Sequence, residues 1–353
     1  MQSFQAFIDA HKEQLKQNQK LYAFFWGLPL YRKTTYCVNN RLKQHISQEG
    51  LSRFGTAAKA VDMFLSLWVY GCSYAEYNLY GFRKLKHRDR QKFIGDCCRK
   101  RYYAKFNAMS DTDCLRNKSM AYEEFKEYYG RQATVFYVSE GFERFCEIVK
   151  VYGTAMVKPV DASGGYGVMK VDYVDSASLK VCFDAISSVS ASGEIFIEEY
   201  VEQNPELKAL HPFSLNTARI ITVLDHKGDP HILGTFFRVG RDGKVVDNGA
   251  SGGLLCKLSE DGTIVRCMNK NGSEFIEHPD TKHQLVGFTI PQWDSAKQLA
   301  RTLAMRKPLI RFCGWDLALS DKGWIMIEGN EASEFIGIQI FGDGCKDQVE
   351  RYL

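Results

Sequence analysis

The sequence predicts an α+β protein with largely antiparallel sheets, preceded by a basic, helix-rich N-terminal region. Up to about residue 108, apolar residues recur at helical spacing and Gly and Pro are sparse. Beyond about residue 115, short strand-like runs alternate with helical ones, and several neighbouring runs are joined by tight turns. A strict alternation of strand and helix would instead indicate a parallel sheet.

Three amphipathic stretches predict the N-terminal helices. The first runs from residue 4 to 15, the second over Ala57–Trp68, and the third over about 89–106, where Arg and Lys are frequent. The commonest meaning of such stripes is a bundle of helices packed on their apolar faces.

The elements beyond about residue 115 are predicted from the spacing of apolar residues, which recur at every second position in strands and about every 3.6 positions in helices. Turn residues mark their ends. Gly153 ends one helix, and glycine-containing turns at 226–229 and 320–323 join neighbouring strands. The expected strands are 134–138, 154–160, 168–174, 194–201, 217–224, 231–239, a meander over 253–268, 311–319 and 324–328, and the expected helices are 140–151, 176–188 and 293–305.

The net charge is small but unevenly distributed. The 353 residues hold 46 Lys+Arg and 42 Asp+Glu, a balance that argues against a nucleic-acid binder. Residues 1–110 carry 19 basic and 7 acidic side chains, a net of +12, and the remainder has a net of −8. The default interpretation of the basic region is a solvated helix face. The alternative is that it docks an anionic partner, such as a diphosphate-linked glycan or an acidic membrane surface.

The eleven cysteines indicate a reducing, cytoplasmic compartment, because they are odd in number and scattered. The adjacent pair Cys97-Cys98 lacks the CxxC spacing of zinc sites. We expect no secretory signal and no transmembrane helix, since no apolar run approaches the roughly 20 residues that span a bilayer.

A lysine and a glycine-rich loop form the first candidate site. Lys158 closes an apolar strand, and the following loop contains Ser163, Gly164, Gly165 and Gly167. Glycines let backbone N–H groups converge on an anion, and a lysine adds a point charge for phosphate oxygens. There is no Walker A motif and no following helix as in a Rossmann loop. The pattern indicates either phosphate binding or a glycine-rich hairpin.

Carboxylates within or at the end of apolar strands form the second candidate site. An apolar strand runs into Glu198-Glu199, which is also a common way for a strand to meet solvent. Asp316 and Glu328 each interrupt an apolar strand, and with Asn330 they supply the oxygen ligands that Mg²⁺ prefers. A three-residue loop ending at Gly323 would place the two acids opposite each other, whereas a two-residue turn would not. We therefore predict a positive φ at Gly323 and both acids on one face.

Two arginines lie in otherwise apolar strands. Arginines in such strands are rarely without a role, and the structural alternative is a buried ion pair of Arg219 or Arg238 with Glu328 or Asp316. The GxSxG match at 249–253 does not indicate a serine hydrolase, because the following residues 254–258 read as a strand rather than a helix.

The order of these motifs resembles the ATP-grasp superfamily over about residues 105–340, and more narrowly the sugar-transfer-associated ATP-grasp family. The matching features are Asn117-Lys118, Lys158 with its glycine loop, Glu198-Glu199-Tyr200-Val201, Arg219, Arg238, Asp316 and Glu328-Gly329-Asn330. The resemblance implies two α+β subdomains that clasp ATP. We accordingly expect a helical region at 1–108, a first subdomain with the lid at 109–201, and a second with the metal site at 202–353.

The resemblance also implies roles for these residues. Lys118 and Lys158 would contact the ATP phosphates, under a lid formed by residues 163–167. Glu198, Glu199 and Val201 would belong to the hinge, which pairs with adenine mainly through backbone groups. Asp316, Glu328 and Asn330 would hold Mg²⁺, although many relatives have Glu at the position of Asp316. Arg219 or Arg238 would stabilise the transferring phosphoryl group or an oxyanion. Either Glu202 or Glu206 would bind the ribose.

The implied function is an ATP- and Mg²⁺-dependent carboxylate–amine ligase. It would form an amide through an acylphosphate on a sugar acid or another surface-polysaccharide precursor, with a small-molecule or glycan-linked carboxylate and an amine as its partners. The alternatives are a phosphotransferase that acts on a hydroxyl and a nucleotide-binding module without activity. Retention of Lys158, Asp316, Glu328 and Asn330 argues against the last, since a module need not keep every metal ligand.

Overall fold

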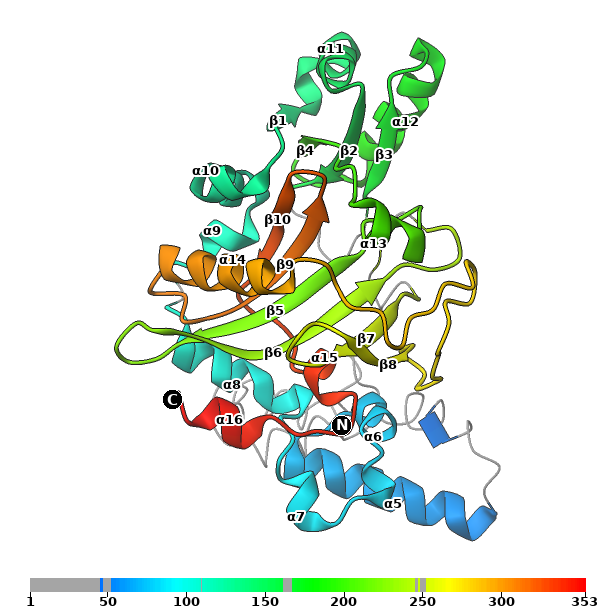
Figure 1. Cartoon of the computed structure of the whole chain (residues 1–353), viewed down its shortest axis with the longest axis vertical. Helices are drawn as coiled ribbons and strands as arrows, with labels where there is room; N and C mark the ends of the chain where they lie inside the picture. Colours follow the sequence, from blue (N-terminus) through cyan, green and yellow to red (C-terminus); the bar gives the residue numbers. More distant parts are fainter. Residues whose placement is uncertain (1–44, 47–51, 109, 161–166, 245–246, 248–251) are drawn as a thin grey trace, which may run out of the picture. The chain divides into compact units, whose positions relative to one another are not determined.

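The computed structural model describes residues 45–46, 52–108, 110–160, 167–244, 247 and 252–353. The expected helix at 4–15 and most of the glycine loop lie outside these residues. The described chain forms two compact units: unit 1 contains the residues up to Lys105 together with Glu334–Leu353, and unit 2 contains Phe106–Ser333. Antiparallel sheets preceded by helices confirm the predicted α+β class (Figure 1). Among the described helices, none is both long and apolar enough to span a bilayer.

Unit 1 is built from short helices around an aromatic core. Its elements are α5 (Arg53–Tyr70), α6 (Tyr74–Leu79), η1 (Phe82–Lys84), α7 (His87–Arg90), α8 (Asp96–Phe106), α15 (Ile336–Gln339) and α16 (Lys346–Glu350). Its buried cluster includes Met63, Leu67, Tyr77, Tyr80, Phe82 and Phe93. The expected helix over Ala57–Trp68 is confirmed within α5. The expected continuous helix at 89–106 is wrong, because Gly95 approaches the backbone of Gly71 and breaks the chain into α7 and α8.

A buried carboxylate, Glu76, ties α6 to the start of α8. The backbone N–H groups of Ser73 and Asp96 donate to its Oε2 at 2.8 and 2.9 Å. The hydroxyl of Tyr80 donates to Oε1 at 3.0 Å. Burial raises the pKa of Glu76 to about 7, against the lowering effect of these backbone donors.

Unit 2 contains two antiparallel sheets, and the sequence patterns located all of their strands. The four-stranded sheet has the order β1-β4-β2-β3 and the six-stranded sheet β10-β9-β5-β6-β7-β8. The strands are β1 (Ala133–Tyr137), β2 (Thr154–Pro159), β3 (Met169–Asp172), β4 (Glu194–Glu199), β5 (Thr217–Leu224), β6 (Pro230–Val239), β7 (Leu254–Leu258), β8 (Ile264–Met268), β9 (Phe312–Ser320) and β10 (Gly323–Asn330).

Each sheet is covered by helices on an apolar face. The small sheet packs against α11 (Phe142–Tyr152) and α12 (Ser176–Val189) through a cluster that includes Phe136, Phe145 and Phe183. The large sheet packs against α10 (Lys118–Tyr129) and α14 (Trp293–Arg306) through a cluster that includes Phe125, Phe237 and Trp315 (Figure 1). The sequence patterns predicted α11, α12 and α14. They missed α9 (Asp113–Arg116), α10 and α13 (Pro205–Leu210).

The hairpin of β9 and β10 confirms the predicted pairing by a different route. Glu328 lies opposite Asp316, and Gly323 has φ 113°. The loop, however, is a two-residue turn, because Gly323 already pairs with Ser320. A β-bulge between Met326 and Glu328 then shifts the register by one residue. The expected three-residue loop is therefore wrong, and the bulge brings the two acids onto one face.

The end of α10 gives a test of packing between a helix and the large sheet. Gly130 caps the helix in the left-handed conformation, and a Cβ there would lie 2.5 Å from Cγ2 of Ile325 on β10. Gly81 has a similar φ, 63° against 59°, but its Cβ would meet nothing within 4 Å. We expect Gly81→Ala to cost about 1 kcal/mol of unfolding free energy through backbone strain alone. Gly130→Ala should cost at least about 2 kcal/mol more, because Ile325 must move. Urea denaturation of both variants measures the difference, and equal losses would contradict this packing.

The raised pKa of Glu76 predicts a loss of stability between about pH 4.5 and 7. The folded state holds the proton up to about pH 7, whereas the unfolded chain releases it near 4.5. The proton therefore stabilises the fold fully below about pH 4.5, and this contribution disappears as the pH rises through 7. It is on the order of 3 kcal/mol. Glu76→Gln should flatten this part of the stability profile, as measured by thermal unfolding across pH. An unchanged slope would contradict the prediction.

Candidate functional site

A row of polar side chains crosses four neighbouring strands of the large sheet on one face. Cross-strand pairing places Arg238 of β6 opposite Thr217 of β5, and Asp316 of β9 opposite Arg219 of β5. Glu328 of β10 lies opposite Asp316 in turn. Opposed residues in an antiparallel pair share a face, and so do residues two apart on one strand. The row therefore lies on the face opposite the apolar side chains that pack against α14.

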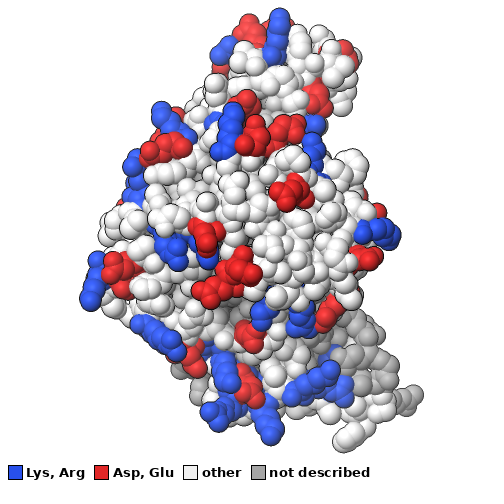
Figure 2. All heavy atoms as spheres, viewed as in Figure 1, with Lys and Arg blue, Asp and Glu red and all other residues white. Residues whose placement is uncertain are grey.

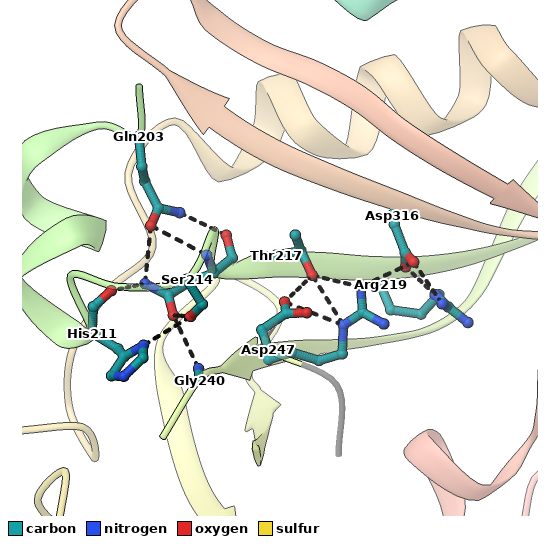
Figure 3. A network of polar contacts seen from close by, with 10 residues as sticks. Gln203, His211, Ser214, Thr217, Arg219, Gly240, Asp247 and Asp316 are labelled. Atoms are coloured by element: carbon teal, nitrogen blue, oxygen red, sulfur yellow. Dashed lines mark hydrogen bonds and ion pairs between the residues drawn. The ribbon is translucent and has the colours of Figure 1, made fainter. Parts of the chain in front are cut away.

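Asp316 is the centre of this row and pairs with both arginines (Figure 3). Arg219 donates from Nε to Oδ1, and from Nη2 to Oδ2 at 2.7 Å. Nη2 of Arg238 lies 2.9 Å from Oδ2. The side chain of Asp316 is only 5% exposed. The ion pair that the sequence left open as an alternative is thus present, and its acid is Asp316 rather than Glu328.

A second acid, Asp247, pairs with Arg238 through a shared hydroxyl. Thr217 donates its Oγ1 hydrogen to Oδ2 of Asp247 and accepts from Nε and Nη2 of Arg238 at 2.9 and 2.6 Å (Figure 3). Oδ2 of Asp247 also lies 3.5 Å from Nε of Arg238. Two buried positive charges are therefore matched by two buried negative charges.

The two acids of this cluster respond differently to burial. Burial would raise the pKa of Asp316, but Arg219 and Arg238 together hold it below its usual value. Burial does raise the pKa of Asp247, because this acid pairs only with Arg238, at a longer distance, and Arg238 also pairs with Asp316. Asp316 is thus held ionised, whereas Asp247 is the more easily protonated of the two.

A second network fixes the segment between α13 and β5, directly before the row (Figure 3). The side-chain Nδ2 of Asn216 donates to the carbonyls of Leu207 and His211 at 2.9 and 3.1 Å and to Oε1 of Gln203 at 3.0 Å. Its Oδ1 accepts the backbone N–H of Gly240 at 3.1 Å. One buried amide therefore joins the 203–216 segment to the ends of β5 and β6, next to Arg219 and Arg238.

Glu328 and Asn330 complete the row and differ from Asp316 in their surroundings. Among the described residues, the exposed Glu328 has no ion-pair partner. Nδ2 of Asn330 is buried and has no hydrogen-bond acceptor within the described part of the chain. A buried donor of this kind can be satisfied by an ordered water or by a ligand oxygen.

Lys158 and Glu198 meet on the small sheet, where the hinge was expected. Lys158 pairs with Phe196 across the strands, so Glu198, two residues further along β4, lies on the same face. The two side chains form an ion pair, and Nη2 of Arg131 lies 2.7 Å from Oε2 of Glu198. Burial would raise the pKa of Glu198, but Arg131 and Lys158 hold it below its usual value.

Arg131 also joins the two sheets of unit 2. Its Nη1 donates to the carbonyl of Met326 on β10 at 2.8 Å, two residues before Glu328. Its side chain is 3% exposed. The chain of contacts from Lys158 through Glu198 and Arg131 to β10 connects the candidate phosphate-binding lysine with the strand that carries Glu328 and Asn330.

The remaining expected residues lie near these two groups or outside the described chain. Asn117 caps α10 through its side chain, and Nζ of Lys118 donates to the carbonyl of Val160 at 3.1 Å, just beyond Lys158. Glu199 is exposed and Val201 is half-buried directly after β4. Gly167 has φ 70°. Ser163, Gly164 and Gly165 lie outside the described residues.

Sequence reasoning missed the importance of Arg131, Thr217 and Asp247. Arg131 sits between a helix-capping glycine and a strand, a position where a solvated charge is ordinary. Its burial depends on Glu198 and on β10, which are 67 and 195 residues away in the chain. No local pattern carries that information.

The asymmetry between Asp316 and Glu328 gives a stability test. Asp316→Asn removes the carboxylate that pairs with both largely buried arginines, and we expect a loss of about 3 kcal/mol or more in unfolding free energy. Glu328→Gln should change it by no more than about 0.5 kcal/mol, because Glu328 is exposed. Chemical denaturation measures both variants. Equal losses would show that Asp316 does not anchor the cluster.

Comparison with solved structures shows distant likenesses. D-alanyl-alanine synthetase A from Vibrio cholerae O1 biovar eltor is 12% identical, with a TM-score of 0.38, covering 62% of this chain and 56% of that one. D-alanine-D-alanine ligase from Helicobacter pylori is 11% identical, with a TM-score of 0.46, covering 70% and 64%. This chain thus spans less than two thirds of either protein. Likenesses at this level do not bear on activity.

A family comparison is more informative than these structures. No curated protein matches the sequence significantly. A family model described as sugar-transfer associated ATP-grasp matches residues 98–351, which include both sheets and every candidate site residue. The chain therefore belongs to the sugar-transfer associated ATP-grasp family.

Proposed function

We propose that this chain is an ATP-dependent carboxylate–amine ligase that forms an amide through an acylphosphate, acting on a sugar acid or another surface-polysaccharide precursor. Family membership supports the use of ATP, and the family's association with sugar transfer supports the substrate class. The observation that carries the proposal is the row of Arg238, Arg219, Asp316 and Glu328 on one sheet face, linked through Arg131 to Lys158.

The described residues fit a magnesium–nucleotide complex. Asp316 is held ionised, Glu328 faces it from the next strand, and Asn330 is two residues further along that strand. No group of three or more His, Cys, Asp or Glu side chains converges in the described part of the chain, so these residues alone do not form a closed metal cage. This suits Mg²⁺, which keeps several waters and is bound through one or two carboxylates and phosphate oxygens. When bound, the ion would neutralise charge on the transferring phosphoryl group.

The protein's own cations would supply the remaining neutralisation. Lys158 would contact a phosphate, with its ammonium held in place by Glu198. Lys118 would add a second charge beside the end of β2. Arg219 and Arg238 would stabilise negative charge on the transferring phosphoryl group or on the tetrahedral oxyanion, and their ion pairs with Asp316 and Asp247 fix their orientation.

The reaction proceeds in two balanced steps. A carboxylate oxygen of the acceptor attacks the γ-phosphorus of ATP, and ADP leaves. The amine then attacks the acyl carbon, and inorganic phosphate leaves as the amide forms and the amine loses a proton. Phosphoryl transfer depends mainly on positioning and charge neutralisation, which is what the cluster provides.

The decisive assay follows ADP and phosphate during incubation with Mg·ATP, a panel of uronic acids and a panel of amines. Phosphate release that requires both a carboxylate and an amine supports ligation. ADP together with a stable phosphorylated sugar would instead show a phosphotransferase. Bound ATP without any turnover would show a binding module.

Two substitutions test the site assignment. Lys158→Ala should lower turnover at least about 100-fold by removing a positive charge beside the transferring phosphoryl group. Glu328→Gln should lower it by a similar factor by removing a charged oxygen ligand that would hold Mg²⁺. Both variants should fold, since Arg131 still pairs with Glu198 and Glu328 is exposed. Lys150→Ala, an exposed residue of α11, is the matched control and should leave turnover unchanged. If turnover survived in either site variant, the assigned site would be wrong.

A further inference from the structure

Helix α5 presents an unusual outer surface. Every exposed residue in its described part is apolar: Phe54, Ala57, Ala58, Val61, Leu65, Trp68 and Val69. At 3.6 residues per turn these positions fall within an arc of about 120°. Phe54 is 86% exposed and Val61 is 59% exposed. A surface helix normally directs charged side chains outward, so this arc indicates contact with another apolar phase or surface.

A cationic segment runs along one edge of this arc. Within unit 1, Arg90 of α7 pairs with Asp62 of α5 at 2.6 Å, and the hydroxyl of Tyr70 lies 2.6 Å from Nδ1 of His87. Asp62 lies about 20° beyond the edge of the arc, whereas Tyr70 lies about 100° beyond it, on the side of α5 that packs against the core of unit 1. These contacts fix η1 and α7 beside it.

The exposed side chains of that segment are almost all basic. Lys84, Lys86 and Arg88 are exposed, and the one acid, Asp89, is paired with Lys92 at 2.9 Å. Figure 2 shows Lys and Arg side chains gathered around α7. An apolar strip bordered by cations is the arrangement by which a peripheral protein binds an anionic lipid surface.

We propose that the apolar arc of α5, together with the basic segment from η1 to α7, docks on an anionic membrane surface. The arc would enter the boundary between headgroups and acyl chains, while Lys84, Lys86 and Arg88 contact lipid phosphates. This docking does not depend on the chemistry of the nucleotide site.

Charge favours a membrane over the other two candidate occupants. A symmetric contact with a second copy would place the same surface against itself and bring two basic segments together. Residues 1–44 carry seven Lys+Arg and two Asp+Glu, so they bring little negative charge to a basic border. An anionic lipid surface matches both the apolar strip and its border.

Vesicle co-sedimentation of the full chain tests the proposal. Vesicles of phosphatidylcholine with 30% phosphatidylserine should bind it at least about tenfold more tightly than phosphatidylcholine alone, and 0.5 M salt should weaken this binding. Equal binding to both compositions, or no binding to either, would overturn the proposal.

Two sets of variants separate the apolar and the cationic contributions. Val61→Glu combined with Leu65→Glu should reduce binding at least tenfold, whereas Val181→Glu combined with Ile276→Glu, at exposed apolar positions of unit 2, should not. Replacing Lys84, Lys86 and Arg88 by Ala should weaken binding about 100-fold, at about fivefold for each side chain. The control triple Lys126→Ala, Lys150→Ala and Lys180→Ala should leave it unchanged.

Two further readouts identify a different occupant. If a second copy covers the arc, light scattering will show a dimer that Val61→Glu dissociates. If another segment of the same chain covers the arc, thermal unfolding will show a large loss of stability in Val61→Glu. Either result, in a chain that does not bind vesicles, overturns the proposal. The variant in which Lys84, Lys86 and Arg88 are replaced by Ala changes only exposed positions, so it still tests the proposal if the glutamate variants fail to fold.

Discussion

The candidate site depends on one buried carboxylate, Asp316, that is held between two arginines. A charge in this position would be strongly destabilising alone, and it is tolerated because Arg219 and Arg238 neutralise it from neighbouring strands. Those arginines need a second acid, which Asp247 provides through Thr217. The result is an electrostatically balanced row whose orientation is fixed before any nucleotide arrives. Preorganised charges of this kind are what phosphoryl transfer requires, because they need no reorganisation during the reaction.

The connection between the two sheets of unit 2 rests on a similar buried pair. Arg131 bonds Glu198 on the small sheet and the carbonyl of Met326 on the large one. Glu198 in turn pairs with Lys158, so one arginine links the expected hinge, the lysine expected to bind phosphate and the strand that carries Glu328. The residues expected to form the hinge and to hold the metal come from different sheets, and Arg131 contacts both sheets. The charges expected to act in function therefore also hold elements of this unit together.

Local patterns predicted most of the fold. Alternating apolar residues located the strands of both sheets, and helical periodicity located α5, α11, α12 and α14. They failed where a tertiary contact overrode local preference. The backbone of Gly71 excludes any Cβ at position 95 and breaks a basic stretch that would otherwise read as one helix. In the β9–β10 hairpin, the pairing of Asp316 with Glu328 was predicted, but it arises from a bulge rather than from the loop, and no sequence signal marked that bulge.

The sequence by itself determined the chemical types at the site: a lysine at a strand end, arginines in apolar strands, and acids where apolar residues are expected. The order of these residues was also enough to place the chain in its family, which the family comparison confirmed. Only the tertiary structure decided which charges neutralise one another, because Arg219, Arg238, Asp247 and Asp316 come from segments far apart in the chain. The same holds for α5, whose outward apolar face is defined by which side packs on Met63 and Leu67. Burial and pairing are properties of the folded surface, and they cannot be read from spacing alone.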